Sequence, residues 1–134
     1  MQEIKDVPQV FRLNIEVADL DQAIEFYDKL LGIDGRPQQG ERVYYTCGSV
    51  DLQIIKAHAV DGPHPLPKAL YFKVTDLESV FERAKALDCV SVDDVHGVSG
   101  GEIIVRPWGE RSFYAYDPWG NPLCFVDAGT VFTA

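Results

Sequence analysis

Polar and apolar residues alternate along residues 11–17, where Leu13, Ile15 and Val17 are separated by polar side chains. A period of two is the pattern of a β-strand, because successive side chains on a strand point to opposite faces. The segment therefore predicts a strand with one apolar and one polar face.

A helix is predicted directly after this strand. Asp19, followed three positions later by Gln22, forms a capping-box pattern that marks the start of a helix. The next apolar residues recur at helical spacing, and Gly32 is placed to end the helix in a left-handed conformation. The apolar residues of this predicted helix are Ile24, Phe26, Tyr27, Leu30 and Leu31.

The same order of apolar and polar positions returns 57 residues later. Leu70, Phe72 and Val74 repeat the strand pattern, and Asp76 takes the place of Asp19 as the expected helix cap. A second helix is predicted from the apolar stripe Val80, Phe81, Ala84 and Leu87.

Each unit continues into short runs typical of strands, and the Asp-Pro and Gly-Asn pairs within residues 117–122 predict a hairpin turn. Two βαβββ units result, at about residues 10–60 and about 68–127, joined by a proline-containing connector at 61–67. Neither unit can bury its sheet alone, so we expect a single α+β domain over residues 1–134. The strand-like runs are 42–46 and 50–55 in the first unit and 102–105, 112–116 and 123–126 in the second.

Composition excludes several classes of partner. The 21 acidic and 12 basic residues give a net charge of −9, which disfavours nucleic acid. No apolar run approaches the roughly 18 residues that span a bilayer, and the first residues lack a signal-peptide pattern, so we expect a cytoplasmic protein with no membrane partner. The three cysteines, Cys47, Cys89 and Cys124, have no CxxC spacing and indicate free thiols in a reducing compartment.

Three short patterns carry a resemblance to a known family. They are Val-Ala-Asp-Leu at 17–20, the Phe-Tyr and Leu-Gly pairs at 26–27 and 31–32, and Asp-Pro-Trp-Gly-Asn-Pro-Leu at 117–123. Together with the doubled unit, the chain resembles the vicinal oxygen chelate superfamily, the group of glyoxalase I, bleomycin-resistance proteins and extradiol dioxygenases. The resemblance covers roughly residues 10–127. It implies two curved mixed sheets around a ligand cleft, and homodimers whose clefts draw on both subunits.

The resemblance also gives the positions at which metal-dependent members carry their ligands. These positions hold Arg12, Gln53, Ala69 and Cys124 in this sequence. Arginine and alanine have no lone pair to donate, glutamine is a weak neutral ligand, and a lone cysteine suits soft metals. Catalytic sites usually have about three protein ligands. We therefore expect a member with no metal and no cofactor, and the sequence identifies no catalytic residue.

Strand alternation separates the predicted faces. An apolar face should pack under the helices; its residues are Leu13, Ile15, Val17, Leu52, Ile54, Leu70, Phe72, Val74, Phe113, Ala115, Leu123 and Phe125. The opposite face mixes aromatic and polar groups, as a site for an organic ligand does, although a solvated sheet face is the alternative. Its candidate ligand-binding residues are Arg12, Asn14, Glu16, Gln53, Tyr71, Lys73, Ser112, Tyr114, Tyr116 and Cys124.

Other candidates each have a structural alternative. Trp108 either closes over the ligand or serves only the fold, and it joins the candidate ligand-binding residues. Cys124 is either an inert buried thiol or a reactive one. The histidines His58, His64 and His96 have no acid or metal partner at recognisable spacing, so we expect them to be solvated.

Three functions remain open. The first is a metal-independent binding protein of the bleomycin-resistance type, which sequesters a small aromatic or cationic compound as a homodimer. The second is a lyase, isomerase or dioxygenase whose non-standard metal site uses Gln53, Cys124 and one or two histidines. The third is a metal-free enzyme with Arg12 or Glu16 as acid or base.

Overall fold

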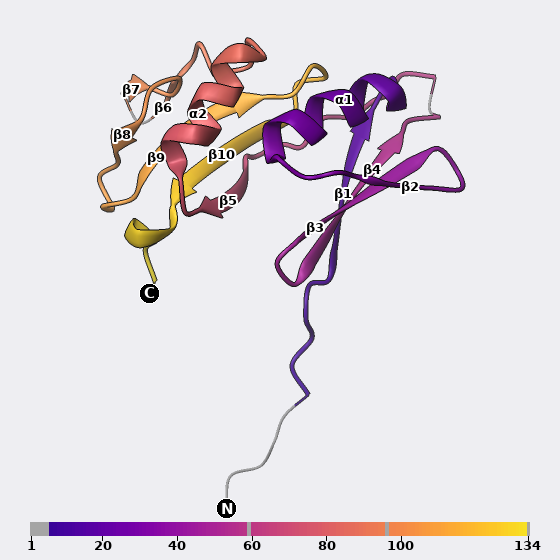
Figure 1. Ribbon diagram of the computed structural model, residues 1–134, viewed down its shortest axis with the longest axis horizontal. Helices are drawn as coiled ribbons and strands as arrows, with labels where there is room; N and C mark the ends of the chain where they lie inside the picture. The colour runs from indigo at the N-terminus through magenta and orange to yellow at the C-terminus, as the bar shows by residue number, and fades with distance from the viewer. Residues whose placement is uncertain (1–5, 59, 96, 134) are drawn as a thin grey trace, which may run out of the picture.

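The computed structural model describes residues 6–58, 60–95 and 97–133, which form two similar units (Figure 1). The first unit contains β1 (Arg12–Val17), α1 (Leu20–Leu31), β2 (Arg36–Gln38), β3 (Arg42–Cys47) and β4 (Val50–Lys56). The second contains β5 (Leu70–Val74), α2 (Leu77–Ala86), β8 (Ile104–Val105), β9 (Arg111–Tyr116) and β10 (Pro122–Asp127). Between α2 and β8, β6 (Asp94–Val95) pairs with β7 (Val98–Ser99), and a short 3₁₀ helix, Ala128–Thr130, follows β10.

Each unit builds a four-stranded sheet, in the order β1-β4-β3-β2 in the first and β5-β10-β9-β8 in the second. The first strand of each unit runs parallel to the last, and the other neighbours are antiparallel. The predicted α+β fold with two mixed sheets is confirmed. The sequence patterns missed β2, whose three residues are too few to show alternation, and the short β6 and β7.

The helix boundaries follow local signals in the sequence. Asp19 caps α1 by accepting a 2.9 Å hydrogen bond from the Gln22 backbone N–H, and Gly32 ends it with a φ of 71°. Asp76 caps α2 by accepting from the backbone N–H and the hydroxyl of Ser79. The predicted starts of both helices are therefore confirmed.

The core runs through both units as one cluster of buried side chains, with α1 and α2 side by side over the sheets (Figure 1). Most of the predicted apolar face is buried, and Leu70, Phe72 and Val74 are partly buried because β5 is an edge strand. Leu13 is the exception: it lies near the start of edge strand β1 and is 37% exposed. No helix within the described ranges is both long enough and apolar enough to cross a membrane.

The turn between β9 and β10 connects the two units through buried hydrogen bonds. The Tyr27 hydroxyl of α1 donates to Asp117 Oδ2 at 2.7 Å. The Asn121 side chain donates to the same oxygen and to the Glu16 backbone carbonyl, and its Oδ1 accepts the Leu66 N–H. Burial, followed by the Asp117 charge, raises the pKa of Tyr27 well above its usual range. The Asp-Pro-Trp-Gly-Asn segment therefore holds α1, β1 and the connector against the second unit.

Candidate functional site

The polar face of the first sheet carries a fixed hydrogen-bond network. Cross-strand register places Gln53 of β4 between Asn14 of β1 and Tyr44 of β3. Gln53 Nε2 donates to Asn14 Oδ1 at 2.8 Å. Arg42 Nη1 donates to Gln53 Oε1 at 2.7 Å and to the Tyr44 hydroxyl at 3.0 Å. Gln53 is only 7% exposed, and both its amide nitrogen and its amide oxygen are hydrogen-bonded within the protein.

Two guanidinium groups lie beside the Tyr44 ring. The Arg12 guanidinium carbon is 5.5 Å from the ring centroid and 5.0 Å from that of Phe11. The Arg42 guanidinium carbon is 5.4 Å from the centroid of Tyr44. These distances are typical of cation–π contacts. Tyr44 therefore holds two cationic side chains on one face of the sheet.

The other charged groups of this face have partners. Arg36 Nη2 donates to Thr46 Oγ1 at 2.9 Å and lies 3.7 Å from Asp51 Oδ1. Glu16 Oε1 accepts the backbone N–H of His64 in the connector at 2.8 Å. Glu16 therefore holds the connector.

The residues at the positions that the resemblance gives for metal ligands have poor chemistry for binding a metal. Gln53 Oε1 accepts a hydrogen bond from the Arg42 guanidinium, and a cationic neighbour opposes binding of a metal cation. Arg12 has no lone pair, and Ala69 has no donor side chain. Within residues 6–58, 60–95 and 97–133, no group of three or more His, Cys, Asp or Glu side chains lies close enough to hold an ion.

The two described histidines do not form a set of metal ligands. His58 Nε2 lies 3.5 Å from a Glu41 carboxylate oxygen, and His64 Nε2 lies 3.4 Å from Asp61 Oδ1. Both imidazoles are exposed on the surface, as predicted. His96 lies outside the described residues.

The polar face of the second sheet is covered by the chain itself. Ser112, Tyr114 and Cys124 are buried, and Cys124 has no exposed surface. Val95 of β6 packs against the small cluster that contains Tyr114 and Cys124, and the Tyr114 N–H donates to the Gly100 carbonyl. Ser112 and Cys124 therefore present almost no surface to a ligand while residues 91–95 and 97–106 remain in place. Their role in ligand binding stays a prediction that requires this segment to move.

Arg106 is the side chain that fastens this segment. It is 2% exposed, and its Nε and Nη2 donate to the Ser112 hydroxyl and carbonyl at 3.0 Å each. Nη1 donates to the Ser99 carbonyl at 3.2 Å, and the guanidinium carbon lies 5.2 Å from the Tyr114 ring centroid. Because carbonyl oxygens and an aromatic face surround the cation, its desolvation is offset without a carboxylate.

The Cys124 thiol beneath Arg106 is held in its neutral form. Burial raises its pKa to about 11, although hydrogen bonds with Ser112 and Tyr114 and the Arg106 charge oppose the shift. Burial and the hydrogen bond with Tyr71 also raise the pKa of Tyr114. At neutral pH the thiol is protonated, which is the weakly nucleophilic and weakly ligating form.

The remaining predicted site residues lie apart from the first-sheet network. Tyr71 is 53% exposed, and its hydroxyl lies 2.9 Å from that of Tyr114. Lys73 is exposed on β5, and the Tyr116 hydroxyl donates to Asp93. Trp108 Nε1 donates to Glu110 Oε1 at 2.7 Å.

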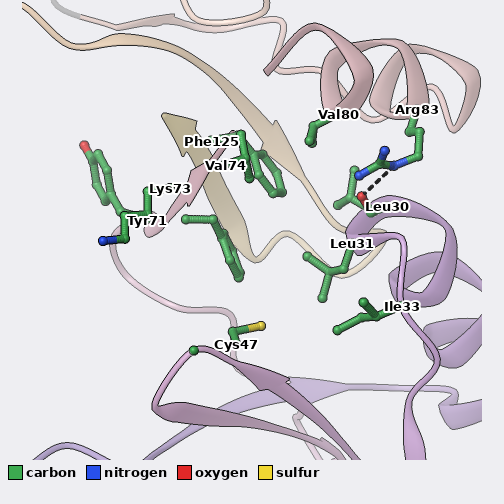
Figure 2. A pocket seen from close by; sticks show the side chains of 12 residues that line it. Leu30, Leu31, Ile33, Cys47, Tyr71, Lys73, Val74, Val80, Arg83 and Phe125 are labelled. Atoms are coloured by element: carbon green, nitrogen blue, oxygen red, sulfur yellow. Dashed lines mark hydrogen bonds between the residues drawn. The ribbon is translucent and has the colours of Figure 1, made fainter. Parts of the chain in front are cut away.

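A cavity of about 410 Å³ opens where the two units meet (Figure 2). Its walls come from α1, α2, β5 and the turn between β3 and β4. Arg83 Nε donates to the Leu30 carbonyl at 3.1 Å and bridges the two helices at one side. The apolar lining side chains are Leu30, Leu31, Ile33, Phe72, Val74, Val80 and Phe125. The cavity follows the outer edge of β5, which no other strand of the sheet covers.

Raising the pH from 9 to 11 is expected to destabilise the protein through its buried thiols. Burial, followed by the Asp88 and Asp117 charges, raises the pKa of Cys89 to about 11 from the ordinary 9.0, as burial does for Cys124. The folded state then binds these protons more tightly than the unfolded chain, so stability is unaffected below pH 9 and falls as the pH rises toward 11. We expect a loss of about 2 kcal/mol per thiol.

Urea unfolding across this pH range, with the double variant Cys89→Ser/Cys124→Ser as the control, measures the effect. The buried tyrosines titrate in both proteins, so the difference in slope isolates the thiols. Equal slopes would show that the thiols titrate normally in the folded state.

Known proteins share this architecture of two βαβββ units. The family model described as the Glyoxalase/Bleomycin resistance protein/Dioxygenase superfamily matches residues 9–125. The chain therefore belongs to this superfamily, and the predicted resemblance is confirmed. No curated protein matches the chain by sequence.

Solved structures with this fold come from proteins with different names and functions. The protein titled "Oxidase ChaP-H2" aligns with a TM-score of 0.74 at 22% identity, over 91% of this chain and 94% of that one. A bleomycin-binding protein complexed with bleomycin aligns with a TM-score of 0.64 at 18% identity, over 90% and 98%. A lactoylglutathione lyase from Agrobacterium tumefaciens aligns with a TM-score of 0.61 at 21% identity, over 92% and 96%. At these identities the likeness shows the fold alone.

Proposed function

We propose that the chain is a metal-independent binding protein for a small aromatic compound, with its site on the polar face of the first sheet. The observation that carries this proposal is the hydrogen bond from Arg42 Nη1 to Gln53 Oε1 at 2.7 Å. It places a fixed cation on the amide at a position where metal-dependent members of the superfamily carry a ligand. The oxygen that would bind a metal instead orients a guanidinium.

The chemistry of this face suits an aromatic ligand. Arg12 is exposed, and Tyr44 is half-buried beside it, so both offer planar surfaces for stacking. The side chains of Asn14 and Gln53 are hydrogen-bonded to each other on the same face of the sheet. A bleomycin-binding protein of the same fold holds a small molecule, which supports the binding class but not the identity of the compound.

We also propose that the protein acts as a cytoplasmic homodimer. β1 and β5 are edge strands, and their unpaired backbone groups favour pairing with another chain. Phe11, Leu13 and Tyr71 expose apolar surface on or next to these strands. A second copy that covers the edges and the cavity beside β5 would bury this surface.

Light scattering during size-exclusion chromatography tests the dimer. The wild type should give twice the chain mass, and the Leu13→Arg variant should give a mass closer to that of the monomer. A monomeric wild type would contradict the proposal.

Metal retention provides the test of the binding class. After dialysis against Mn²⁺, Zn²⁺, Ni²⁺ or Fe²⁺ and removal of free ions, the protein should retain no stoichiometric metal. Calorimetric titration with planar aromatic compounds should give the same affinity with and without a chelator. The Gln53→Ala variant is the matched control. One ion retained per wild-type chain and lost in this variant would overturn the proposal.

No observation of this structure specifically favours either of the two enzyme alternatives. A metal-dependent lyase, isomerase or dioxygenase needs a ligand set that the described residues do not form. In the metal-free alternative, Arg12 or Glu16 would be an acid or base. The Glu16 carboxylate accepts a backbone N–H of the connector, and an arginine side chain stays protonated and so is a poor acid or base. We therefore carry only the binding function forward.

A further inference from the structure

We infer that the ligand of the first-sheet face carries a carboxylate, and that Arg12 and Arg42 recognise this group beside Tyr44. The inference rests on the proposed binding function and names the class of compound: a planar aromatic acid. It replaces the expectation of a cationic compound, which accompanied the resemblance to bleomycin-resistance proteins and which the net charge of −9 favours.

Local charge on this face opposes the charge of the whole molecule. Arg36 is balanced by Asp51, 3.7 Å away. Neither Arg12 nor Arg42 forms an ion pair within the parts of the chain that the structure describes. At physiological salt the screening length is about 8 Å. Acidic residues farther away than this therefore act only weakly on a ligand that is in contact with the two guanidiniums.

The nearest acidic groups of the face do not compensate. Asp51 is the cross-strand register partner of Arg12 but forms no ion pair with it. Its carboxylate accepts from the Thr46 hydroxyl at 2.7 Å and lies 3.7 Å from Arg36. Glu16 is bound to the connector through the N–H of His64. The face therefore keeps two uncompensated positive charges around one aromatic ring, an arrangement in which a bound anion would lower their mutual repulsion.

The two guanidiniums also keep free hydrogen-bond donors. Arg42 uses Nε for the Gln39 carbonyl at 2.9 Å and Nη1 for Tyr44 and Gln53. Its Nη2 has no hydrogen-bond partner among the described residues, and none of the five N–H groups of Arg12 has one there. Paired N–H groups on a planar fork match the two oxygens of a carboxylate.

The Arg42 donors are oriented by hydrogen bonds within the protein, and Arg12 lies against two aromatic rings. Gln53 is held by Asn14 on one side and by Arg42 on the other. Arg12 lies against the rings of Phe11 and Tyr44. Because the donors need little reordering, less conformational entropy is lost on binding. A planar acid can place its ring on the Tyr44 and Arg12 surfaces and its carboxylate on the free N–H groups.

Three probes that differ only in charge test the inference: naphthoate, naphthamide and naphthylmethylamine, titrated by calorimetry into chelator-treated protein. We expect naphthoate to bind at least about tenfold more tightly than naphthamide, which corresponds to about 1.4 kcal/mol. The amine should bind most weakly. The preference for naphthoate should shrink as salt is added.

Single-residue variants identify the side chains that cause the preference for the acid over the amide. Arg12→Gln, at an exposed position, and Arg42→Gln should each remove most of the preference for the acid over the amide. Arg36→Gln, on the same face but paired with Asp51, should preserve it. Arg42→Lys keeps the charge but not the fork and should give an intermediate ratio.

The outcomes separate the inference from the function on which it rests. If acid and amide bind equally and the arginine variants change nothing, the carboxylate assignment fails while metal-free binding stands. If naphthoate binds only when a divalent ion is added, both fail. If no probe binds, the carboxylate assignment fails, and the metal-retention experiment still decides the binding class.

Discussion

Replacing Asp117 with alanine is expected to lower the free energy of unfolding by about 3–5 kcal/mol. The carboxylate accepts hydrogen bonds from the Tyr27 hydroxyl, the Asn121 side chain, and the backbone N–H groups of Trp119 and Asn121. Asp117 and Asn121 are buried, so water cannot replace the lost acceptor without rearrangement of the turn. Several buried donors are then unsatisfied, each at a cost of about 1–3 kcal/mol.

Urea unfolding followed by circular dichroism measures this loss. The matched control is Tyr27→Phe, which removes one donor and leaves the carboxylate with its other partners; it should cost only about 1 kcal/mol. If Asp117→Ala is no more destabilising than Tyr27→Phe, the turn does not hold the two units together as its hydrogen bonds imply.

Replacing Arg106 with alanine is expected to cost about 3 kcal/mol or more and to expose the second sheet. The substitution removes the hydrogen bonds to Ser112 and Ser99 and leaves a cavity over the Tyr114 ring. Residues 91–95 and 97–105 then lose the side chain that fastens them over the polar face. Alkylation of Cys124 by iodoacetamide, mapped by mass spectrometry, should therefore become much faster than in the wild type.

A second arginine provides the control for Arg106. Arg111 pairs with Glu78 and Asp127 near the surface, so Arg111→Ala should cost only about 1 kcal/mol or less and leave Cys124 protected. Arg106→Lys should be intermediate, because a lysine keeps the charge but cannot reach every carbonyl. Unchanged protection of Cys124 in Arg106→Ala would mean that another contact holds the segment.

Local patterns predicted most of the fold because their causes are local. The alternation of Leu13, Ile15 and Val17 reflects the two faces of one strand, and Asp19 and Gly32 act within a turn of their own helix. The doubled unit then follows from repetition. Residues 91–95 and 97–101 gave no such pattern, because their conformation depends on β9 and on Arg106 rather than on neighbours in sequence.

The residues of the proposed site were predicted in part for the same reason. Alternation placed Arg12, Asn14 and Gln53 on one face, and the register confirms that these positions are cross-strand neighbours or near neighbours. Arg42 and Tyr44 were missed, although they alternate in β3, because the strand predicted over 42–46 was assigned to neither face; the register now pairs Tyr44 with Gln53.

On the second sheet, alternation identified the polar face correctly but could not show that it is covered. The signal for this cover was weak, since an arginine such as Arg106 is usually a surface residue. Its burial depends on three carbonyl oxygens and an aromatic ring that come together only in the folded chain.

The Gln53 amide gives the sharpest test of whether this face binds its ligand without a metal. In nitrogen–proton correlation spectra, naphthoate added in the presence of a chelator should shift the side-chain amide signals of Gln53 and Asn14. Without chelator, one equivalent of Mn²⁺ should leave both signals sharp, because the Arg42 guanidinium already occupies the amide oxygen. Selective broadening of the Gln53 signal by Mn²⁺, with naphthoate shifts that appear only when the ion is present, would contradict a metal-free site.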